Sequence, residues 1–479
     1  MRRLVALFAL SLAAGCGPAG LDFGPKFLWG AATSAHQIEG NDTDSDIWAW
    51  EQAGNTLEKA GLADDSYRRF TEDSRLLTEA GLNAYRFSLD WSRLEPSPGQ
   101  WNDEAEAHYH ALLDDLKARG IRPMVTLHHF SAPRWLNDFA RPPGGIDGWA
   151  DPRAADAFES FARHAATAFG GQVDLWLTFN EPMVYALGAY AEGHFPPGTH
   201  QMDLTEKLLP TVLPNLIDAH VRAARAIHEA DTVDADGDGS AARVGIAQDI
   251  VPLHPATGAD RAGTARYDSF YNHLFLRAAA QGAYDATLSG DGPVDHPEWA
   301  GSLDFVGINY YTAVAFVSAQ AFHPVEGLPC DGSLETATGL PLEALGCPAI
   351  KGERSDQGQE IVPDGLREAV TAVWQAYGLP IFITENGVAT LDDDLRSRHL
   401  AAHLKALHAA MAAGARVEGY FYWSLLDNFE WGSFAPRYGL YRVDYANDFA
   451  RSPTGAVPLL RRTARASLLS DQDVRELAP

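Results

Sequence analysis

The chain has 479 residues, of which 46% are hydrophobic, and this is enough to bury a large core in one big domain or in a few smaller ones. It carries 37 lysines and arginines against 64 aspartates and glutamates, which gives a formal net charge of −27. This acidity argues against a nucleic-acid partner and against anionic membrane surfaces, since both require a basic surface.

The first residues are typical of an export signal. Arg2 and Arg3 precede the apolar run 4–14, and the small residues of "LAAGC" lead directly to Cys16. This ending resembles a bacterial lipoprotein signal, in which Cys16 is lipidated and becomes the mature N-terminus. Ordinary cleavage to a soluble protein is the alternative. We expect residues 1–16 to be an export signal, and the product to be a cell-envelope lipoprotein or a periplasmic or secreted protein.

From residue 20 onward, strand patterns alternate with amphipathic helical patterns. The helical patterns include 104–119, 154–168, 216–230 and 395–413, and no linker-like tract marks a domain boundary. The predicted strands are, in chain order, "FLWGAAT" (27–33), "NAYRFSL" (83–89), "RPMVTLH" (122–128), "VDLWLTF" (173–179), "RVGIAQD" (243–249), "LDFVGIN" (303–309), "PIFIT" (380–384) and "EGYFYWS" (418–424).

Eight buried strands that alternate with helices predict an α/β fold, a single (β/α)8 TIM barrel with long βα loops. A doubly wound sheet is the competing fold. It would require a glycine-rich GxGxxG turn after an early strand, and the sequence does not contain this motif. The barrel is therefore favoured.

Polar residues gather where the predicted strands end. In "DLWLTFNEP" (174–182), a buried strand gives way to Asn180 and Glu181, and Pro182 stops the strand because proline cannot donate to a sheet. The carboxyl ends of barrel strands share one face, where active sites lie. Other strand ends carry Gln37 and Glu39, Arg86, His128 and His129, Asn309 to Tyr311, Glu385 and Asn386, and Trp423.

The segment "DADGDG" (234–239) resembles the start of a calcium-binding loop, because Asp234, Asp236 and Asp238 alternate before a glycine. The twelfth position of an EF-hand loop would be Gly245 instead of a bidentate glutamate. We therefore favour a solvated acidic turn over a structural calcium site.

Cys330 and Cys347 are the only cysteines besides Cys16. In an exported protein such a pair predicts a disulfide that closes a loop, whereas two free thiols would be expected in a reducing compartment. Metal binding is not expected, because neither cysteine has a partner at ligand spacing.

Seven sequence blocks follow one another along the chain: "FLWGAATSAHQIEG", "YRFSLDWSRLEP", "TLHHFSAPRWL", "TFNEP", "GINYYT", "ITENGV" and "WSLLDNFEW". Together they resemble glycoside hydrolase family 1, the β-glucosidase and β-galactosidase type. The blocks run from residue 27 to about 445. The resemblance implies that residues 17–479 form one hydrolase domain, which acts on small β-glycosides or oligosaccharides and requires no cofactor for catalysis.

Glycoside hydrolysis needs a carboxylic acid that protonates the leaving oxygen and a carboxylate on the other side of the sugar ring. By resemblance, Glu181 is the general acid/base and Glu385 the nucleophile of a retaining mechanism. The fourth and seventh strands bring them together across the barrel. Arg86 and Tyr311 are expected to favour the carboxylate form of Glu385.

The remaining site residues are expected to hold the sugar. Asn180 can hydrogen-bond the 2-hydroxyl, and Asn309 can support the same region near the nucleophile. Planar hydrogen-bonding groups and an aromatic face suit a neutral ligand rich in hydroxyls. The residues that match the family's contacts to the nonreducing sugar are Gln37, His129, Glu430 and Trp431, with Trp423 as the platform.

Glu430 bears on the choice of sugar. Relatives that act on 6-phosphorylated sugars resemble one another in lacking this acid, and a carboxylate would repel a phosphate. Here "FEWGS" keeps the acid, and no lysine or arginine follows before Arg437. We expect an exo-acting β-glucosidase, with β-galactosides or β-fucosides as alternative substrates.

Two other functions are compatible with parts of this pattern. A transglycosidase of the same fold would pass the sugar to another sugar instead of water, and no motif separates it from a hydrolase. A surface carbohydrate-binding protein without catalysis would need neither Glu181 nor Glu385, so their presence argues against it.

If Cys16 is lipidated, the native protein should partition into the detergent phase, and Cys16→Ala should move it to the aqueous phase. Detergent phase separation and mass spectrometry of the N-terminal peptide measure both effects. A mature protein that begins at Gly17 or later, with no acyl chain, would contradict this prediction.

Overall fold

The computed structural model describes residues 20–140, 144–288, 294–318 and 323–478. Arg2, Arg3 and Cys16, on which the predicted export signal rests, lie outside this part of the chain. No helix within the described ranges combines the length and the apolar character that crossing a membrane requires.

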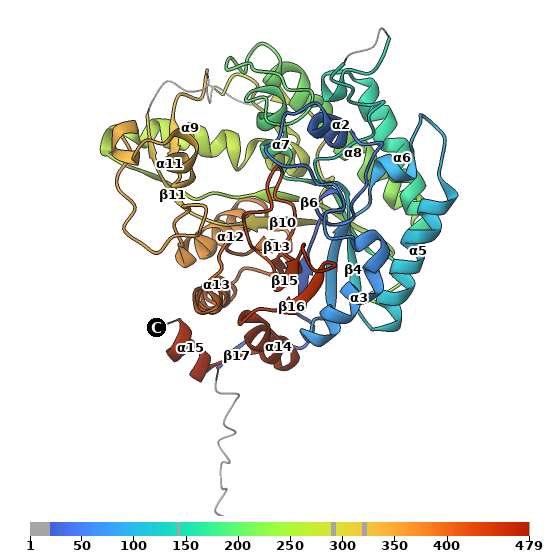
Figure 1. Cartoon of the computed structure of the whole chain (residues 1–479). Coiled ribbons are helices and arrows are strands. Elements are labelled where there is room, and N and C mark those ends of the chain that lie inside the picture. The colour runs from blue at the N-terminus through green and yellow to red at the C-terminus, as the bar shows by residue number, and fades with distance from the viewer. Residues whose placement is uncertain (1–19, 141–143, 289–293, 319–322, 479) are drawn as a thin grey trace, which may run out of the picture.

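Eight parallel strands close into a barrel at the centre of the molecule (Figure 1). Each of the eight predicted strands overlaps one of them, so the predicted TIM barrel is confirmed. The first and last barrel strands, β2 and β14, pair and close the barrel. The strands are β2 (Leu28–Ala32), β3 (Ala84–Ser88), β4 (Arg122–His128), β5 (Leu175–Asn180), β6 (Arg243–Asp249), β10 (Phe305–Tyr310), β13 (Ile381–Asn386) and β14 (Val417–Trp423).

Helices surround this barrel on the outside (Figure 1). The helix α5 shows how such a segment starts: Asn102 accepts hydrogen bonds from the backbone N–H groups of Glu104 and Ala105, and acidic residues occupy the first turn, where the helix dipole favours them. The main surrounding helices are α3 (Ser66–Glu79), α5 (Asp103–Ala118), α6 (Arg153–Phe169), α8 (Leu213–Ala230), α10 (Leu274–Gln281), α12 (Pro363–Tyr377), α13 (Asp393–Ala412) and α14 (Ala456–Ala466).

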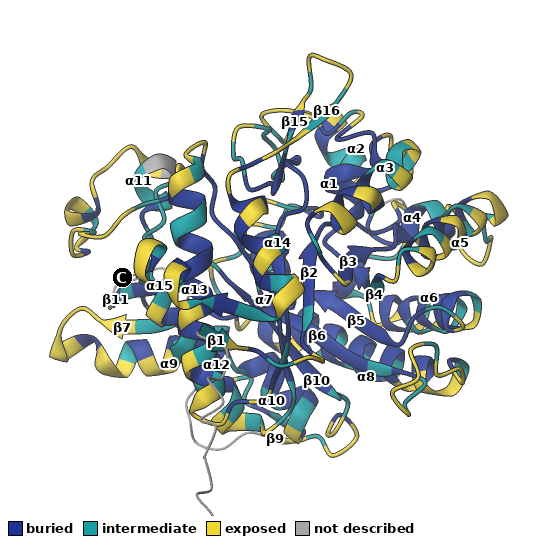
Figure 2. Ribbon diagram, turned by 90° about the horizontal axis from the view of Figure 1, so that it is seen from below, coloured by how far each residue is buried: buried dark blue, intermediate teal, exposed yellow. Residues whose placement is uncertain are grey.

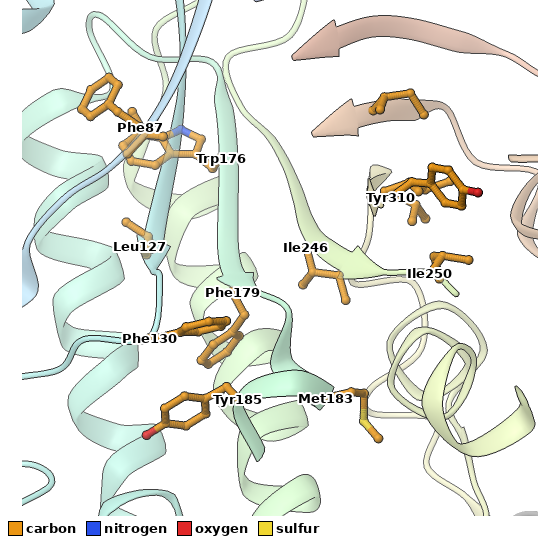
Figure 3. Packing of buried hydrophobic residues seen from close by; sticks show 14 of the residues in the cluster. Phe87, Leu127, Phe130, Trp176, Phe179, Met183, Tyr185, Ile246, Ile250 and Tyr310 are labelled. Carbon is orange, nitrogen blue, oxygen red and sulfur yellow. The ribbon is translucent and has the colours of Figure 1, made fainter. Parts of the chain in front are cut away.

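The barrel strands bury side chains on both surfaces, which explains their nearly continuous apolar sequences. In β5, Leu175 and Leu177 belong to a cluster inside the barrel. Trp176 and Phe179 belong to the larger cluster between strands and helices (Figure 3), where the Phe179 ring lies 4.7 Å from that of Phe158 on α6. Figure 2 shows the result, with buried strands and exposed residues on the outer surfaces of the helices.

Long βα loops with short elements of their own extend from the barrel, as predicted. Three strands, β7, β11 and β12, form a small sheet, and β15 pairs with β16. The further elements are β1 (Gly20–Asp22), α1 (Ala35–Ile38), α2 (Asp46–Gln52), α4 (Trp91–Leu94), η1 (Gly148–Ala150), α7 (Pro182–Tyr190), η2 (Leu208–Val212), β7 (Leu253–Pro255), η3 (Gly258–Asp260), α9 (Arg261–Tyr271), β8 (Ala283–Tyr284), β9 (Val294–Asp295), β11 (Val314–Val317), β12 (Leu328–Cys330), α11 (Ser333–Thr338), η4 (Leu342–Leu345), β15 (Tyr441–Asp444), β16 (Ala450–Pro453), β17 (Leu468–Ser470) and α15 (Asp471–Leu477).

The loop after β11 contains the disulfide predicted from the sequence. Cys330 at the end of β12 is bonded to Cys347, with an S–S distance of 2.05 Å. Both cysteines are buried in a small apolar cluster with Val317 and Leu342. The bond therefore anchors the long segment between β10 and α12 from within.

A buried arginine ties together the loops that follow β13 and β14. Arg396 on α13 donates from Nη1 to the carbonyl oxygens of Val388 at 3.1 Å and Tyr438 at 2.7 Å. Its Nη2 donates to the carbonyl oxygens of Thr390 and Arg437. These loops flank the strand ends that carry Glu385 and Trp423, so Arg396 helps to hold that side of the barrel mouth.

Candidate active site

Glu181 lies between the end of β5 and the start of α7, as the position of Pro182 predicts. Its backbone adopts the left-handed conformation, with φ 43° and ψ 58°. This conformation costs a non-glycine residue about 1–3 kcal/mol and is found mainly at functional sites. The N–H of Glu181 donates to the carbonyl of Ala247 on β6 at 2.6 Å. This bond holds the residue at the carboxyl end of the barrel strands.

Three of the strands that carry site residues change their pairing register beside those residues. Such irregularities redirect side chains, and they concentrate near active sites. They place Asn180, Asn309 and Glu385 toward a common centre. The register shifts lie between Leu177 and Asn180 in β5, between Ile308 and Asn309 in β10, and between Ile383 and Asn386 in β13.

Glu385 is held by the two residues that the sequence predicted. Arg86 donates from Nη1 to Oε1 of Glu385 at 2.6 Å, and the Tyr311 hydroxyl donates to Oε2 at 2.5 Å. Arg86 is fully buried and also donates from Nη2 to Oδ1 of Asn180 at 2.6 Å. A cation and a phenol thus stabilise the carboxylate form of Glu385.

Glu181 has a different set of contacts. Its Oε1 accepts a hydrogen bond at 2.7 Å from Nδ2 of Asn309, which is a neutral donor. Asn309, expected near the nucleophile, therefore binds the acid directly. Its own Oδ1 accepts from the hydroxyl of Thr384 at 2.7 Å, which fixes the orientation of the amide.

These contacts separate the ionisation of the two carboxyl groups. Burial raises the pKa of both. At Glu181, the negative charges of Glu385 and Asp249 raise the pKa further, so that it lies well above the usual range. At Glu385, the charge of Arg86 and the hydrogen bond from Tyr311 offset part of this rise, and its pKa stays above the usual range by less than that of Glu181. Glu181 therefore keeps its proton while Glu385 is the carboxylate.

The five predicted sugar contacts lie together at the barrel mouth. Gln37 donates from Nε2 to Oε2 of Glu430 at 3.3 Å, and Trp423 donates from Nε1 to Oε1 of Glu430 at 3.1 Å. The ring of His129 lies 5.8 Å from that of Trp423 and 5.9 Å from that of Trp431. The result is a patch of aromatic faces and hydrogen-bonding groups suited to hydroxyls.

Asn180 connects this patch to the two carboxyl groups. Its Nδ2 lies 3.0 Å from Nε2 of His129, and its Oδ1 accepts from both Arg86 and Asn309. Burial lowers the pKa of His129 well below its usual range, so its Nε2 is available as an acceptor for the amide. The sugar contacts and the catalytic pair thus form one hydrogen-bonded network.

Comparison with known proteins places the chain in a family. A sequence model described as glycosyl hydrolase family 1 matches residues 21–457. The chain belongs to glycosyl hydrolase family 1. It is similar to the β-galactosidase of Pyrococcus woesei, with 31% identity over 88% of this chain and 93% of that protein. The family members are β-glycosidases, and the chain is a glycoside hydrolase with the TIM barrel of that family.

Two solved family 1 structures are also similar to the chain. A β-glycosidase from Pyrococcus horikoshii gives a TM-score of 0.82 at 32% identity, covering 96% of this chain and 99% of that one. A mutant of a rice β-glucosidase in a covalent complex with glucose gives 0.79 at 29% identity, covering 93% and 99%.

Several residues at the mouth were missed by sequence analysis. Asp249 ends β6 and contributes to the high pKa of Glu181. The pattern of polar strand ends could have identified it, because Asp249 is the last residue of the predicted strand 243–249. Asn428, which accepts from Nε2 of Gln37 at 2.9 Å, and Thr384 gave no comparable signal.

The acidic turn of Asp234, Asp236 and Asp238 lies before β6, at the opposite end of the barrel from Glu181. Carboxylate oxygens of Asp174, Asp234 and Asp236 lie within 4.8 Å of one another. The carboxylate of Asp174 accepts from the N–H groups of residues 235 and 236, and Arg122 pairs with Asp236 and Asp238. These donors offset the acidic charge of the turn.

Tyr311→Phe should shift the acid limb of the kcat/KM–pH profile upward by about one pH unit. The hydrogen bond from Tyr311 lowers the pKa of Glu385, so its loss raises that pKa, and a bond to a charged group is worth about 1.5–3 kcal/mol. The measurement is the pH profile with an aryl β-glycoside.

Tyr310→Phe is the matched control. The Tyr310 hydroxyl donates to the carbonyl of Val362 and not to Glu385, so this variant should keep the wild-type acid limb. Equal shifts in both variants would refute the assignment of Tyr311 to Glu385.

Proposed function

We propose that the protein is a retaining, exo-acting β-glycosidase, and in particular a β-glucosidase that removes terminal nonreducing β-D-glucosyl residues by double displacement. The observation that carries this proposal is the unequal support of the two carboxyl groups. Glu385 is bonded to Arg86 and Tyr311, whereas Glu181 is bonded to the neutral Asn309. A nucleophile needs the first environment and a general acid the second.

In the first step, an oxygen of Glu385 attacks the anomeric carbon while Glu181 gives its proton to the glycosidic oxygen. The bond to the leaving group breaks, and an ester between Glu385 and the sugar forms. Asn180, which is held by Arg86 and Asn309, is in place to hydrogen-bond the 2-hydroxyl as positive charge develops on the ring.

In the second step, Glu181 takes a proton from water, the water attacks the anomeric carbon, and Glu385 is released. The ester has no charge, so the contribution of Glu385 to the high pKa of Glu181 disappears in the intermediate. The pKa of Glu181 therefore falls when this residue must act as a base. The covalent glucose complex of the similar rice enzyme supports such an intermediate.

Glu430 supports the proposed preference for an unphosphorylated sugar. It lies beside Gln37 and Trp423, and burial together with the charge of Glu385 raises its pKa to about 8. The pocket therefore already contains several buried carboxyl groups, and not all of them can be ionised near neutral pH. Arg437, the nearest cation in the following sequence, lies 3.5 Å from the carboxylate of Asp427.

A panel of p-nitrophenyl β-glycosides tests the proposal. Wild type should cleave the β-glucoside and should cleave its 6-phosphate at least about a thousandfold less well. The dianionic phosphate would enter a desolvated pocket that already contains the carboxylate of Glu385, and like charges there cost several kcal/mol. Glu430→Ser should weaken cleavage of the glucoside without creating activity on the phosphate. Comparable kcat/KM values for the two substrates would contradict the proposed preference for an unphosphorylated sugar. Cleavage rates of the β-galactoside and the β-fucoside, compared with that of the β-glucoside, measure the glycone preference.

The roles of the two glutamates predict different effects when each is replaced by glutamine. Glu385→Gln should lose turnover by about a thousandfold or more, because no covalent intermediate can form. Glu181→Gln should still react with substrates that have good leaving groups and then stall. Azide should restore its rate and yield a β-glycosyl azide, which NMR identifies. An α-glycosyl azide from Glu181→Gln would show that the roles are misassigned.

Transglycosylation is the alternative fate of the intermediate. Product analysis with and without an added sugar acceptor separates it from hydrolysis. We also propose that the enzyme acts outside the cytoplasm, and the disulfide between Cys330 and Cys347 supports this, because such bonds persist in oxidising compartments.

A further inference from the structure

A cavity of about 330 Å³ opens beside the acid Glu181. Its lining includes Glu181 and Tyr311 but none of the five residues that contact the nonreducing sugar. Glu181 is only 9% exposed, and no described residue donates to its Oε2. Because Glu181 must protonate the leaving oxygen, the leaving group has to lie on this side. The cavity is therefore the site of the aglycone.

The walls of this cavity are acidic. Besides Glu181 they include Glu192, Asp249 and Asp331, and no lysine, arginine or histidine is among its described lining residues. Glu192 has a histidine partner, His194, which is well exposed and lies 3.3 Å from its carboxylate. Among the described lining residues, no lysine, arginine or histidine lies beside Asp249 or Asp331, so no cation of the lining compensates their charge when they are ionised.

Asp249 is held in place by a tyrosine hydroxyl. The Tyr271 hydroxyl donates to its Oδ2 at 2.6 Å, while no described residue donates to its Oδ1. Burial raises the pKa of Asp249 to about 7. A bound cation would favour the ionised form of this carboxyl, and the fixed orientation requires no rearrangement on binding.

The rest of the lining is aromatic and aliphatic. The rings of Tyr267 and Tyr271 stack at 5.7 Å, and Leu187, Val251 and other apolar residues complete the walls. Apolar surfaces suit the body of an organic leaving group, and tyrosine faces attract cations. The cavity thus combines space for a hydrophobic group with a negative potential.

We infer that the cavity selects β-glycosides whose aglycone joins an apolar body to a protonated amine, such as an aryl- or alkylammonium group. The inference rests on the proposed glycosidase function and adds the class of leaving group. Neutral aglycones lack the attraction to Asp249 and Asp331, and aglycones with a carboxylate are repelled by both.

Three aryl β-glucosides with the same ring test this inference: the para-(aminomethyl)phenyl, para-(hydroxymethyl)phenyl and para-(carboxymethyl)phenyl compounds. At low ionic strength, kcat/KM for the amine should exceed that for the alcohol by about tenfold, and the carboxylate should be the poorest substrate. Added salt should reduce the difference between the amine and the alcohol.

Charge-removing variants identify the source of the preference. Asp249→Asn and Asp331→Asn should each lower the amine-to-alcohol ratio severalfold. Asp103→Asn, an exposed residue in the first turn of α5, removes the same charge far from the cavity and should leave the ratio unchanged. If Asp249→Asn changes kcat/KM by the same factor for all three substrates, Asp249 acts only by raising the pKa of Glu181, and the inference fails.

A binding measurement separates this inference from the proposed function. In calorimetric titrations of wild type with the three free phenols, the amine should bind more tightly than the alcohol. Equal binding of the amine and the alcohol, together with equal kcat/KM values, overturns the inference but does not contradict the proposed glycosidase function. If another glycone is cleaved in place of glucose, the same ratios are measured on that glycone. Preferential binding of the amine without any turnover would instead count against the glycosidase.

Discussion

A buried cation, Arg86, joins the ends of the strands β3, β5 and β13. Arg86 is completely buried, and its guanidinium donates to Glu385, to Asn180 and to the carbonyl oxygen of Thr384. A buried ion without partners would be destabilised by several kcal/mol, so the arginine and the residues around it require one another. The strand β3 supplies Arg86, β5 supplies Asn180, and β13 supplies both Thr384 and Glu385. The closed barrel brings these residues within reach of one another.

The guanidinium of Arg86 lies near several acidic groups. Burial raises the pKa of Glu181, Glu385, Asp249 and Glu430 alike, and among these four only Glu385 is paired with the guanidinium. Of Glu181 and Glu385, the one bonded to Arg86 therefore ionises more readily. The proposed acid and the proposed nucleophile are thus distinguished by their neighbours, although both residues are glutamates at the ends of parallel strands.

The sequence predicted the barrel and most of the site, because buried parallel strands have a distinctive composition and their carboxyl ends share one face. The residues near Glu385 followed from this rule and from the family resemblance. The contact between Asn309 and Glu181 did not, because it depends on the register shift within β10. The cavity beside Glu181 was also missed, since segments that are far apart in sequence form its walls and carry no recurring pattern.

The disulfide has a consequence for the range of substrates. Cys330 lies between Pro329 and Asp331, and both neighbours line the cavity beside Glu181. This wall of the cavity is thus covalently tied to Cys347, 17 residues further along the chain. Glu181 and Glu385 stand at the ends of barrel strands, which this bond does not join. Production of the enzyme in a reducing cytosol would therefore alter aglycone selectivity before it altered the chemistry, and the oxidation state of a preparation belongs among the conditions under which its substrates are compared.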